Sequence, residues 1–320
     1  MTDSLAFVEI KNISKRYSDF SLRNISLELE RGKILTFMGE SGSGKTSILR
    51  IISGLDFPDS GKVLISGRDI TEIRPGKRNV GMVFQDLALF PHMTAYDNIA
   101  YGLRSLRYKE SRIEQMVSNI SETIRISSFL EKFPGNISGG EKQRVAMARS
   151  LVMEPDLLLM DEPMSSLDPG LRNDIMVEIK SISRKLDQTI IYVTHDVKEG
   201  LFLGDSIVYI GDGEVVRKGS PEEIWNNPES EKLARFLGFN IIKVKGEKVA
   251  VRPEEIEIVE NSEVTGKILG YGFEGSGYRL DAELIDGQKI CIWTGSTPRK
   301  IIGGKNINVG IRFGEKMKLK

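Results

Sequence analysis

Three observations in the sequence predict an α/β fold followed by a small all-β domain. Two short apolar runs, Leu157–Met160 and Thr189–Val193, have the length and composition of buried strands. A helical segment that opens at Pro169 separates them, and its apolar residues recur every three or four positions. Strands that alternate with helices are typical of a parallel sheet covered on both faces. Beyond Phe239, short β-type runs broken by glycine replace this pattern.

The elements before these runs fit the same plan. The segment Phe7–Glu30 alternates apolar and polar residues in places, as antiparallel strands with one solvated face do. The apolar run Ile34–Met38 predicts a buried strand, and Ser47–Ile52 predicts a helix after it. From about residue 88 to residue 150 the pattern is helical. The apolar stripe of the helix that opens at Pro169 consists of Leu171, Ile175, Ile179, Ile182 and Leu186.

The pattern places a domain boundary at residue 238, so that residues 1–238 form the first domain. Ser220 and Pro221 suit the N-cap and the first turn of a helix. A second short helix is expected to stop at Gly238. Residues 239–320 then predict a small all-β domain, most simply a barrel. Its β-type runs are Val264–Leu269, Tyr278–Leu284, Lys289–Trp293 and Ile307–Phe313.

The composition is that of an ordinary globular protein with about two domains. The 320 residues include 45 Lys plus Arg and 45 Asp plus Glu, so net charge gives no general argument for nucleic acid as a partner. The single cysteine, Cys291, excludes an internal disulfide framework. The apolar runs are far shorter than the ~20 residues that span a bilayer, and no secretion signal is expected.

Residues 39–46 fit the pattern Gly-x-x-x-x-Gly-Lys-Ser/Thr of a phosphate-binding loop. The glycines let the backbone turn tightly, so that its N–H groups approach an anion. Lys45 would bring a positive charge to the β- and γ-phosphates, and Thr46 would offer a hydroxyl to Mg²⁺. The helix that follows would point its N-terminus at the phosphates. The nucleotide-binding residues predicted here are Gly39, Glu40, Ser41, Gly42, Ser43, Gly44, Lys45, Thr46 and Ser47.

Two carboxylates follow the buried strand Leu157–Met160. Asp161 can hold Mg²⁺ through water, and Glu162 can orient or deprotonate an attacking water. Such an acidic pair is more often a loop start or a helix cap, and it is the phosphate loop that favours the catalytic interpretation. His195 follows the next strand, where a neutral imidazole could hydrogen-bond a γ-phosphate oxygen or the water. Gln85 could reach the metal or the water from a neighbouring strand.

A second site of phosphate type is predicted at Ser138, Gly139 and Gly140, which precede another helical segment. A hydroxyl, exposed N–H groups and the helix dipole together suit an anion. The same residues would serve equally well as an ordinary helix N-cap, and the local sequence does not separate the two interpretations. Two phosphate-type sites in one chain suggest that the second site of one molecule closes on the nucleotide of another.

In order and spacing, these segments resemble the ATP-binding cassette family, the ABC transporter ATPases, over about residues 5–238. The resemblance implies a P-loop NTPase cassette: a mixed sheet core, an antiparallel β subdomain and a helical subdomain over about 88–150. Val251–Glu254 resembles the start of the OB-like regulatory domain that follows the cassette in sugar, polyamine, sulfate and ferric-iron importers. The matching motifs are Walker A at 39–46, Walker B at Leu157–Glu162, the signature at Ile137–Glu141, the Q-loop at Gln85, the D-loop at Ser165–Asp168, the switch histidine at His195 and the adenine-stacking aromatic residue at Tyr17.

The resemblance also implies roles for these residues. Two copies of the chain, or one copy and a homologous cassette, would pair head to tail around ATP and Mg²⁺. The signature departs from the family pattern, because Ile137 and Glu141 stand where Leu and Gln are common. Glu141 would weaken this pairing if its carboxylate pointed at the triphosphate. The implied residues are Glu162, His195 and Gln85 for catalysis, Thr46, Gln85 and Asp161 for the metal, Ser166 and Asp168 in the D-loop, and Ser138, Gly139, Gly140 and Glu141 acting in trans.

The family further implies membrane partners that this chain does not contain. Integral membrane permease subunits would contact a zone such as Asp86–Met93, although its apolar residues Leu89, Phe90 and Met93 would equally well belong to the core of the helical subdomain. An extracytoplasmic solute-binding protein would act indirectly. The chain would then lie on the cytoplasmic face of the cell membrane, with a sugar, a polyamine or an inorganic ion as cargo. No nucleic-acid partner is expected, because the tail lacks interleaved basic and aromatic residues. The alternatives are an exporter's ATPase subunit and a soluble cassette protein acting on ribosomes or DNA; the tail favours import.

Overall fold

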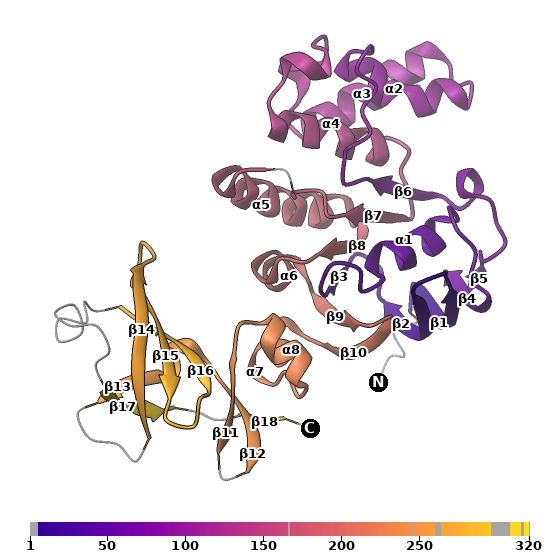
Figure 1. Ribbon diagram of the computed structural model, residues 1–320. Helices are drawn as coiled ribbons and strands as arrows, with labels where there is room; N and C mark the ends of the chain where they lie inside the picture. Colours follow the sequence, from indigo (N-terminus) through magenta and orange to yellow (C-terminus); the bar gives the residue numbers. More distant parts are fainter. Residues whose placement is uncertain are drawn as a thin grey trace. The chain divides into compact units, whose positions relative to one another are not determined.

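The computed structural model of the protein divides into two compact units, Met1–Glu222 and Glu223–Lys320 (Figure 1). The sequence places a domain boundary at residue 238, whereas the second unit of the structure begins within the first of the two short helices that precede that boundary. The structure describes residues 6–165, 167–244, 246–259, 264–295, 308–314 and 317–319.

A six-stranded mixed sheet forms the centre of the first unit. Its strand order is β10-β9-β3-β8-β7-β6, with β10 antiparallel to β9 and the other neighbours parallel. Every residue of β3, β7 and β8 is buried, which explains why these strands read as continuous apolar runs. The predicted α/β class is thereby confirmed. The strands are β3 (Ile34–Met38), β6 (Val80–Val83), β7 (Leu157–Asp161), β8 (Thr189–Thr194), β9 (Ser206–Gly211) and β10 (Glu214–Gly219).

A second, antiparallel sheet with the order β2-β1-β4-β5 covers part of the first unit. Ile25, Leu27 and Leu29 of its first hairpin are buried, while the polar residues between them are exposed. This alternation is the one that the sequence shows, and it follows from the two-residue period of a strand. The strands are β1 (Val8–Arg16), β2 (Ser21–Leu29), β4 (Ser60–Ile65) and β5 (Arg68–Asp69).

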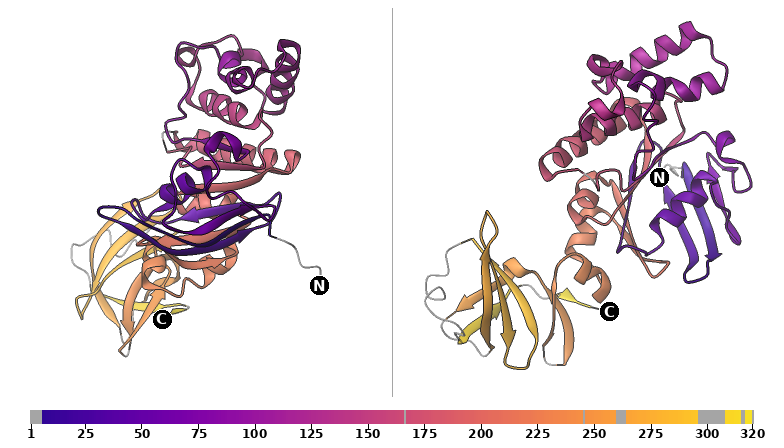
Figure 2. Two further views of the ribbon diagram at one scale, coloured as in Figure 1. Left: turned by 90° about the vertical axis from the view of Figure 1, so that its right-hand side faces the viewer. Right: turned by 45° about the horizontal axis from the view of Figure 1, so that its top comes forward.

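The helices of the first unit cover the central sheet on both faces. Alternate residues of each central strand enter different cores: Leu157 and Leu159 pack with α1 and the antiparallel sheet, whereas Leu158 and Met160 pack with the remaining helices. Both views of Figure 2, like Figure 1, show the antiparallel sheet and the helices α2–α4 on opposite sides of this unit. The helices are α1 (Lys45–Ser53), α2 (Ala95–Ser105), α3 (Glu110–Thr123), α4 (Gly139–Leu151), α5 (Pro169–Leu186) and α6 (Val197–Leu203).

The apolar stripe of α5 faces the core over its middle, as the sequence predicts. Ile175, Ile179 and Ile182 are buried. Leu186, at the last position of the helix, is 42% exposed, because the stripe there runs past the edge of the core.

The second unit contains most of one short helix, a second short helix and an all-β part. Helix α7 begins at Pro221, as predicted, and ends at Asn226. The β strands form a three-stranded sheet, β11-β12-β18, and a five-stranded sheet, β13-β17-β14-β15-β16, which share one apolar core. The predicted small all-β domain is confirmed. The elements are α7 (Pro221–Asn226), α8 (Glu231–Phe236), β11 (Asn240–Val244), β12 (Glu247–Val251), β13 (Ile256–Val259), β14 (Thr265–Phe273), β15 (Tyr278–Leu284), β16 (Lys289–Thr294), β17 (Asn308–Phe313) and β18 (Met317–Lys318).

Candidate functional site

The loop between β3 and α1 has the backbone of a phosphate cradle. Gly42 and Gly44 have φ of 80° and 104°, values that side-chain-bearing residues rarely adopt. A Cβ on Gly39 would lie 2.2 Å from the carbonyl oxygen of Ile210, so the loop packs tightly against the sheet on that side. No atom lies within 4 Å of the Cβ position of Gly42, so the loop is open on the other. An anion therefore has room at the N-terminus of α1.

Lys45 curls over this loop. Its side chain is buried, and Nζ donates hydrogen bonds of 2.8 Å to the carbonyl oxygens of Gly39 and Glu40. Burial lowers the pKa of Lys45, while Glu162 and Asp161 act to raise it. The ammonium is thus held against the loop backbone, where a phosphate oxygen could replace a carbonyl as its partner.

Thr46 and Asp161 come together from the start of α1 and the end of β7. Thr46 Oγ1 donates a 2.9 Å hydrogen bond to Asp161 Oδ1. Burial raises the pKa of Asp161, and the hydrogen bond from Thr46 opposes this shift. A hydroxyl and a carboxylate oxygen are ligands that Mg²⁺ prefers, so the pair fits that ion together with phosphate oxygens. The described residues contain no group of three or more His, Cys, Asp or Glu that could hold a metal without such help.

Gln85 lies at the same edge of the sheet, in the turn after β6. The strands β6 and β7 run parallel, so Gln85 follows the end of one and Asp161 ends the other. Gln85 is exposed, and the described hydrogen bonds of Asp161 and Thr46 do not include it. Gln85 therefore lies at the same edge of the sheet as the pair, and no described hydrogen bond joins it to them.

Glu162 and His195 form a direct pair beyond the ends of β7 and β8. His195 Nδ1 lies 2.9 Å from Glu162 Oε2. Glu162 has a φ of 43°, in the left-handed region that non-glycine residues rarely occupy, and its N–H donates to the carbonyl oxygen of Val193. Strained backbone of this kind persists where the surroundings fix it, often at functional sites. When Nδ1 carries the proton, it holds the Glu162 carboxylate and leaves Nε2 free to accept a hydrogen bond.

Tyr17 follows β1 and lies beside the start of α1. Its ring stacks on Phe20, with centroids 6.1 Å apart, and Phe20 also lies 2.6 Å from the Cβ position of Gly44. Tyr17 Oη donates a 2.9 Å hydrogen bond to Asp56, which also pairs with Lys15. Burial, with the bond to Asp56, raises the pKa of Tyr17. The sequence singled out neither Phe20 nor Asp56, since both depend on contacts between distant segments.

Ser138 is the N-cap of α4, and it forms a capping box with Glu141. Ser138 Oγ accepts from the N–H of Glu141 at 3.3 Å, and Glu141 Oε2 accepts from the N–H of Ser138 at 2.7 Å. This second bond lowers the pKa of Glu141 and holds its carboxylate at its own helix start. The pattern Ser-x-x-Glu predicts such a box from sequence. The prediction for Glu141 considered only its charge near the triphosphate and did not assign the residue to a capping box.

The capping box occupies the N–H groups of Ser138 and Glu141, and so determines which hydrogen-bond donors at the start of α4 remain for an anion. The N–H groups of Gly139 and Gly140 have no acceptor within the helix, and the Ser138 hydroxyl keeps its proton free to donate. A Cβ on Gly140 would lie 2.8 Å from Leu171, so glycine is needed where α4 packs against the start of α5. A cap and an anion site are therefore compatible here.

Asp168 caps α5, since its Oδ1 accepts a 3.1 Å hydrogen bond from the N–H of Leu171. Arg172 then connects this segment to the one after His195. Its Nη2 donates to the carbonyl oxygen of Leu167 at 3.0 Å, and its Nη1 lies 3.4 Å from Asp196 Oδ2. Ser166, predicted beside Asp168, lies outside the described residues. Sequence reasoning missed Arg172, because its partners lie on separate elements.

A buried carboxylate fixes the strand that leads to His195. Glu199 of α6 is 4% exposed, and its Oε2 accepts hydrogen bonds from Tyr192 Oη at 2.9 Å and Thr194 Oγ1 at 2.7 Å. Burial raises the pKa of Glu199, and the two hydroxyls oppose that shift. No pattern in the sequence predicts that Glu199 is buried, because the segment around it contains both polar and apolar residues.

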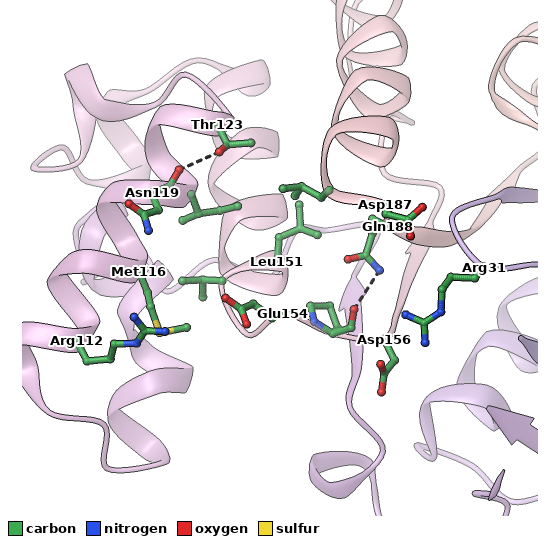
Figure 3. Close-up of a pocket in the computed structure, with 14 residues that line it drawn as sticks. Arg31, Arg112, Met116, Asn119, Thr123, Leu151, Glu154, Asp156, Asp187 and Gln188 are labelled. Atoms are coloured by element: carbon green, nitrogen blue, oxygen red, sulfur yellow. Dashed lines mark hydrogen bonds between the residues drawn. The ribbon is translucent and has the colours of Figure 1, made fainter. Parts of the chain in front are cut away.

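A hollow of about 460 Å³ lies at the opposite edge of the central sheet (Figure 3). Arg112 and Met116 of α3 face it from one side, and Gln188, which donates to the carbonyl oxygen of Pro155, faces it from the other. None of the predicted nucleotide-binding or catalytic residues lines it. The hollow is therefore separate from the site at the carboxyl ends of the strands.

Comparison with known proteins agrees with this geometry. A family model described as ABC transporter matches residues 22–165. The chain is 36% identical to the spermidine/putrescine import ATP-binding protein PotA of Clostridium acetobutylicum, over 95% of this chain and 94% of that protein. It is 39% identical to the Fe(3+) ions import ATP-binding protein FbpC of Brucella abortus (82% and 72% covered), and 41% identical to the molybdate/tungstate import ATP-binding protein WtpC of Pyrococcus abyssi (82% and 76% covered).

Solved structures give the same result for the fold. The structure of cbiO1 from Clostridium perfringens, part of the ABC transporter complex cbiONQ, matches with a TM-score of 0.65 and 29% identity, over 72% of this chain and 93% of that one. The cassette MJ0796, in a dimeric structure bound to ADP and Pi, matches with a TM-score of 0.59 and 31% identity, over 67% and 98%. No helix in the described part of the chain is both long enough and apolar enough to span a membrane.

From the family model and the curated relatives, the chain belongs to the ABC transporter family, among its import ATP-binding proteins.

Proposed function

We propose that this chain binds and hydrolyses ATP as a subunit of an importer, and that closure of two cassettes on ATP drives partner permease subunits. The observation that carries the proposal is the convergence at one sheet edge of the phosphate cradle, the Thr46–Asp161 pair and the Glu162–His195 pair. Phosphoryl transfer requires little beyond positioned charges and an aligned nucleophile, and this edge offers the charges and a carboxylate that can align a water.

In this proposal, residues 39–47 bind the triphosphate of ATP. Lys45 exchanges its carbonyl partners for β- and γ-phosphate oxygens, and the loop N–H groups hold the remaining oxygens. Thr46 and Asp161 hold Mg²⁺, with Gln85 approaching from the next strand. The ion would neutralise charge on the β- and γ-phosphates.

Glu162 and His195 act on the attacking water. Glu162 accepts the proton of the water as its oxygen attacks the γ-phosphorus, and His195 holds the carboxylate in position. The bond between the γ-phosphorus and the β,γ-bridging oxygen then breaks, giving ADP and inorganic phosphate. The left-handed backbone of Glu162 gives its side chain a different direction from the one that continuing the strand β7 would give, and so holds the carboxylate at the end of β7.

A second cassette completes each ATP site. The Ser138 hydroxyl and the N–H groups of Gly139 and Gly140 would bind the γ-phosphate in trans, with Glu141 retained in its capping box. Ser166 and Asp168 of the D-loop would approach the same interface. The dimeric form of the similar cassette MJ0796 supports pairing of this kind.

We infer the membrane partners from the relatives. Three of them are named for the import of polyamines, ferric ions and molybdate or tungstate. Because these cargoes differ widely in charge and size, we assign cargo choice to the permease and to an extracytoplasmic solute-binding protein. The chain then lies at the cytoplasmic face of the membrane, and residues 239–320 serve as its regulatory domain.

A tagged copy of the chain, purified in mild detergent from its own cells, tests this function. We expect integral membrane subunits to co-purify, and the complex in lipid vesicles to hydrolyse ATP faster when solute and binding protein are supplied. Mass spectrometry of the co-purified proteins and phosphate release are the measurements. Recovery with ribosomes or DNA, and with no membrane protein, would favour a soluble cassette instead.

Tyr17→Ala tests the proposed contact with adenine. We expect it to weaken ATP binding by ~1–3 kcal/mol, the contribution of one stacked base. Tyr17→Phe keeps the ring and loses only the hydrogen bond to Asp56, so it should bind ATP almost as wild type does. Isothermal titration with ATP measures both variants, and an unchanged affinity in Tyr17→Ala would rule out stacking.

A further inference from the structure

The turn after β6 has an unusual backbone. Leu87 and Ala88 have φ of 60° and 44°, and in the described part of the chain they are the only two consecutive non-glycine residues in the left-handed region. Neither side chain can form the local hydrogen bonds that let Asn or Asp adopt this conformation. The turn carries Gln85 at its start, so something outside it must hold the conformation that positions Gln85.

Arg149 in the last turn of α4 supplies that hold. Its Nη1 donates a 2.6 Å hydrogen bond to the carbonyl oxygen of Ala88, and its Nη2 donates a 2.7 Å bond to that of Leu87. The rigid guanidinium fork therefore spans the two strained residues, which a lysine ammonium could not do with the same geometry. The guanidinium also lies 5.8 Å from the ring centroid of Phe90, and the Leu87 side chain packs against the core that contains α4.

The far end of the same segment is attached to another helix. Asn98 of α2 is fully buried, accepts from the N–H of Phe90 at 2.8 Å and donates to its carbonyl oxygen at 3.1 Å. The segment after Gln85 is thus held between α4 and α2, and Arg149 donates the hydrogen bonds that α4 makes to Leu87 and Ala88.

Helix α4 therefore reaches both proposed ATP contacts of the chain. It begins at the Ser138 capping box, and about 16 Å further on Arg149 in its last turn holds the Gln85 turn. A displacement of this helix at Ser138 would therefore reach Leu87 and Ala88 through the guanidinium.

We propose that Arg149 is a positioning residue that keeps the strained Gln85 turn attached to α4, so that closure of a second cassette's ATP on Ser138 moves this turn. The proposal rests on the proposed function for its second half, because that half requires Ser138 to meet ATP. The first half, retention of the turn, concerns one chain without nucleotide. The two halves can therefore fail separately.

Hydrogen exchange of the full chain tests retention of the turn. Peptides that span 84–90 contain the hydrogen-bonded amides of Leu87 and Phe90, whose exchange reports opening of the turn. We expect Arg149→Met to speed this exchange about tenfold or more without nucleotide, and Arg149→Lys to have an intermediate effect. The matched control is Arg144→Met, which removes the α4 contact to Glu178 of α5 and should leave 84–90 at the wild-type rate.

Relief of strain gives an independent readout. Ala88→Gly removes the need to hold a side-chain-bearing residue at positive φ, so in the Arg149→Met background it should restore part of the lost protection. Equal exchange at 84–90 in wild type and Arg149→Met, or the same change in Arg144→Met, would overturn retention of the turn by Arg149.

The transmission is measured in the Glu162→Gln background with ATP and Mg²⁺. We expect ATP to change exchange at 84–90 in the parent and to leave it unchanged after Arg149→Met, while ATP affinity stays within about twofold. A nucleotide effect that persists without Arg149 would overturn the transmission. Failure of the parent to dimerise with ATP would instead overturn the proposed function, with retention of the turn decided by the nucleotide-free experiment.

Discussion

Glu162→Gln is expected to lower ATP turnover by about 10²–10⁴-fold, the range that general-base catalysis contributes. The amide keeps the size of the side chain and can still contact His195, but it cannot take the proton of the attacking water. ATP binding should survive, because Lys45 and the phosphate loop are untouched. The variant should therefore accumulate as an ATP-bound dimer, measured by light scattering after gel filtration with ATP and Mg²⁺, alongside phosphate release.

The backbone offers a matched control for this substitution. Glu154 also lies at positive φ, 49° against 43° for Glu162, and it is exposed at the opposite edge of the sheet. Glu154→Gln should thus leave both turnover and the monomer–dimer equilibrium unchanged. Near-normal turnover in Glu162→Gln would remove Glu162 from the role of base, and a loss shared by both variants would point to a backbone effect.

Ser138→Arg should abolish the ATP-driven dimer and its turnover while leaving ATP binding to the single chain intact. The long cation would fill the space that the γ-phosphate of a second copy must enter, and the nucleotide of the same chain lies on other residues. ATP titration and sedimentation of the dimer give the two readouts.

Ser138→Asp separates the anion site from the helix cap. Aspartate is a good N-cap, so the melting temperature should stay close to that of wild type. Its negative charge would nevertheless repel the phosphate, so closure should be lost as in Ser138→Arg. ATP-driven dimers of Ser138→Asp would show that Ser138 is only a cap.

The sequence predicted the elements whose residues lie close together along the chain. Continuous apolar runs identify β3, β7 and β8, because a strand buried on both faces has no polar positions. The phosphate loop was predictable because its glycines and Lys45 act through local backbone geometry. From the sequence, Glu162 and His195 were expected only to lie at the same edge of the sheet. The 2.9 Å contact between them is seen only in the structure.

The remaining features depend on tertiary contacts. Three sets of hydrogen bonds join segments that are far apart in the sequence: Tyr17 to Asp56, Arg172 to Asp196, and Arg149 to the Gln85 turn. A single charged residue in a helix is ordinarily solvated, so the sequence pattern does not show that it hydrogen-bonds a distant segment. Glu141 is different, since its capping box was readable in the sequence and only the structure drew attention to it.

The most direct test of the account is a structure of Glu162→Gln with ATP and Mg²⁺. The account predicts a head-to-tail pair in which Ser138 Oγ of one copy lies about 3 Å from a γ-phosphate oxygen bound by residues 39–47 of the other. A nucleotide-filled phosphate loop with Ser138 exposed to solvent in every pairing of the chains would contradict it.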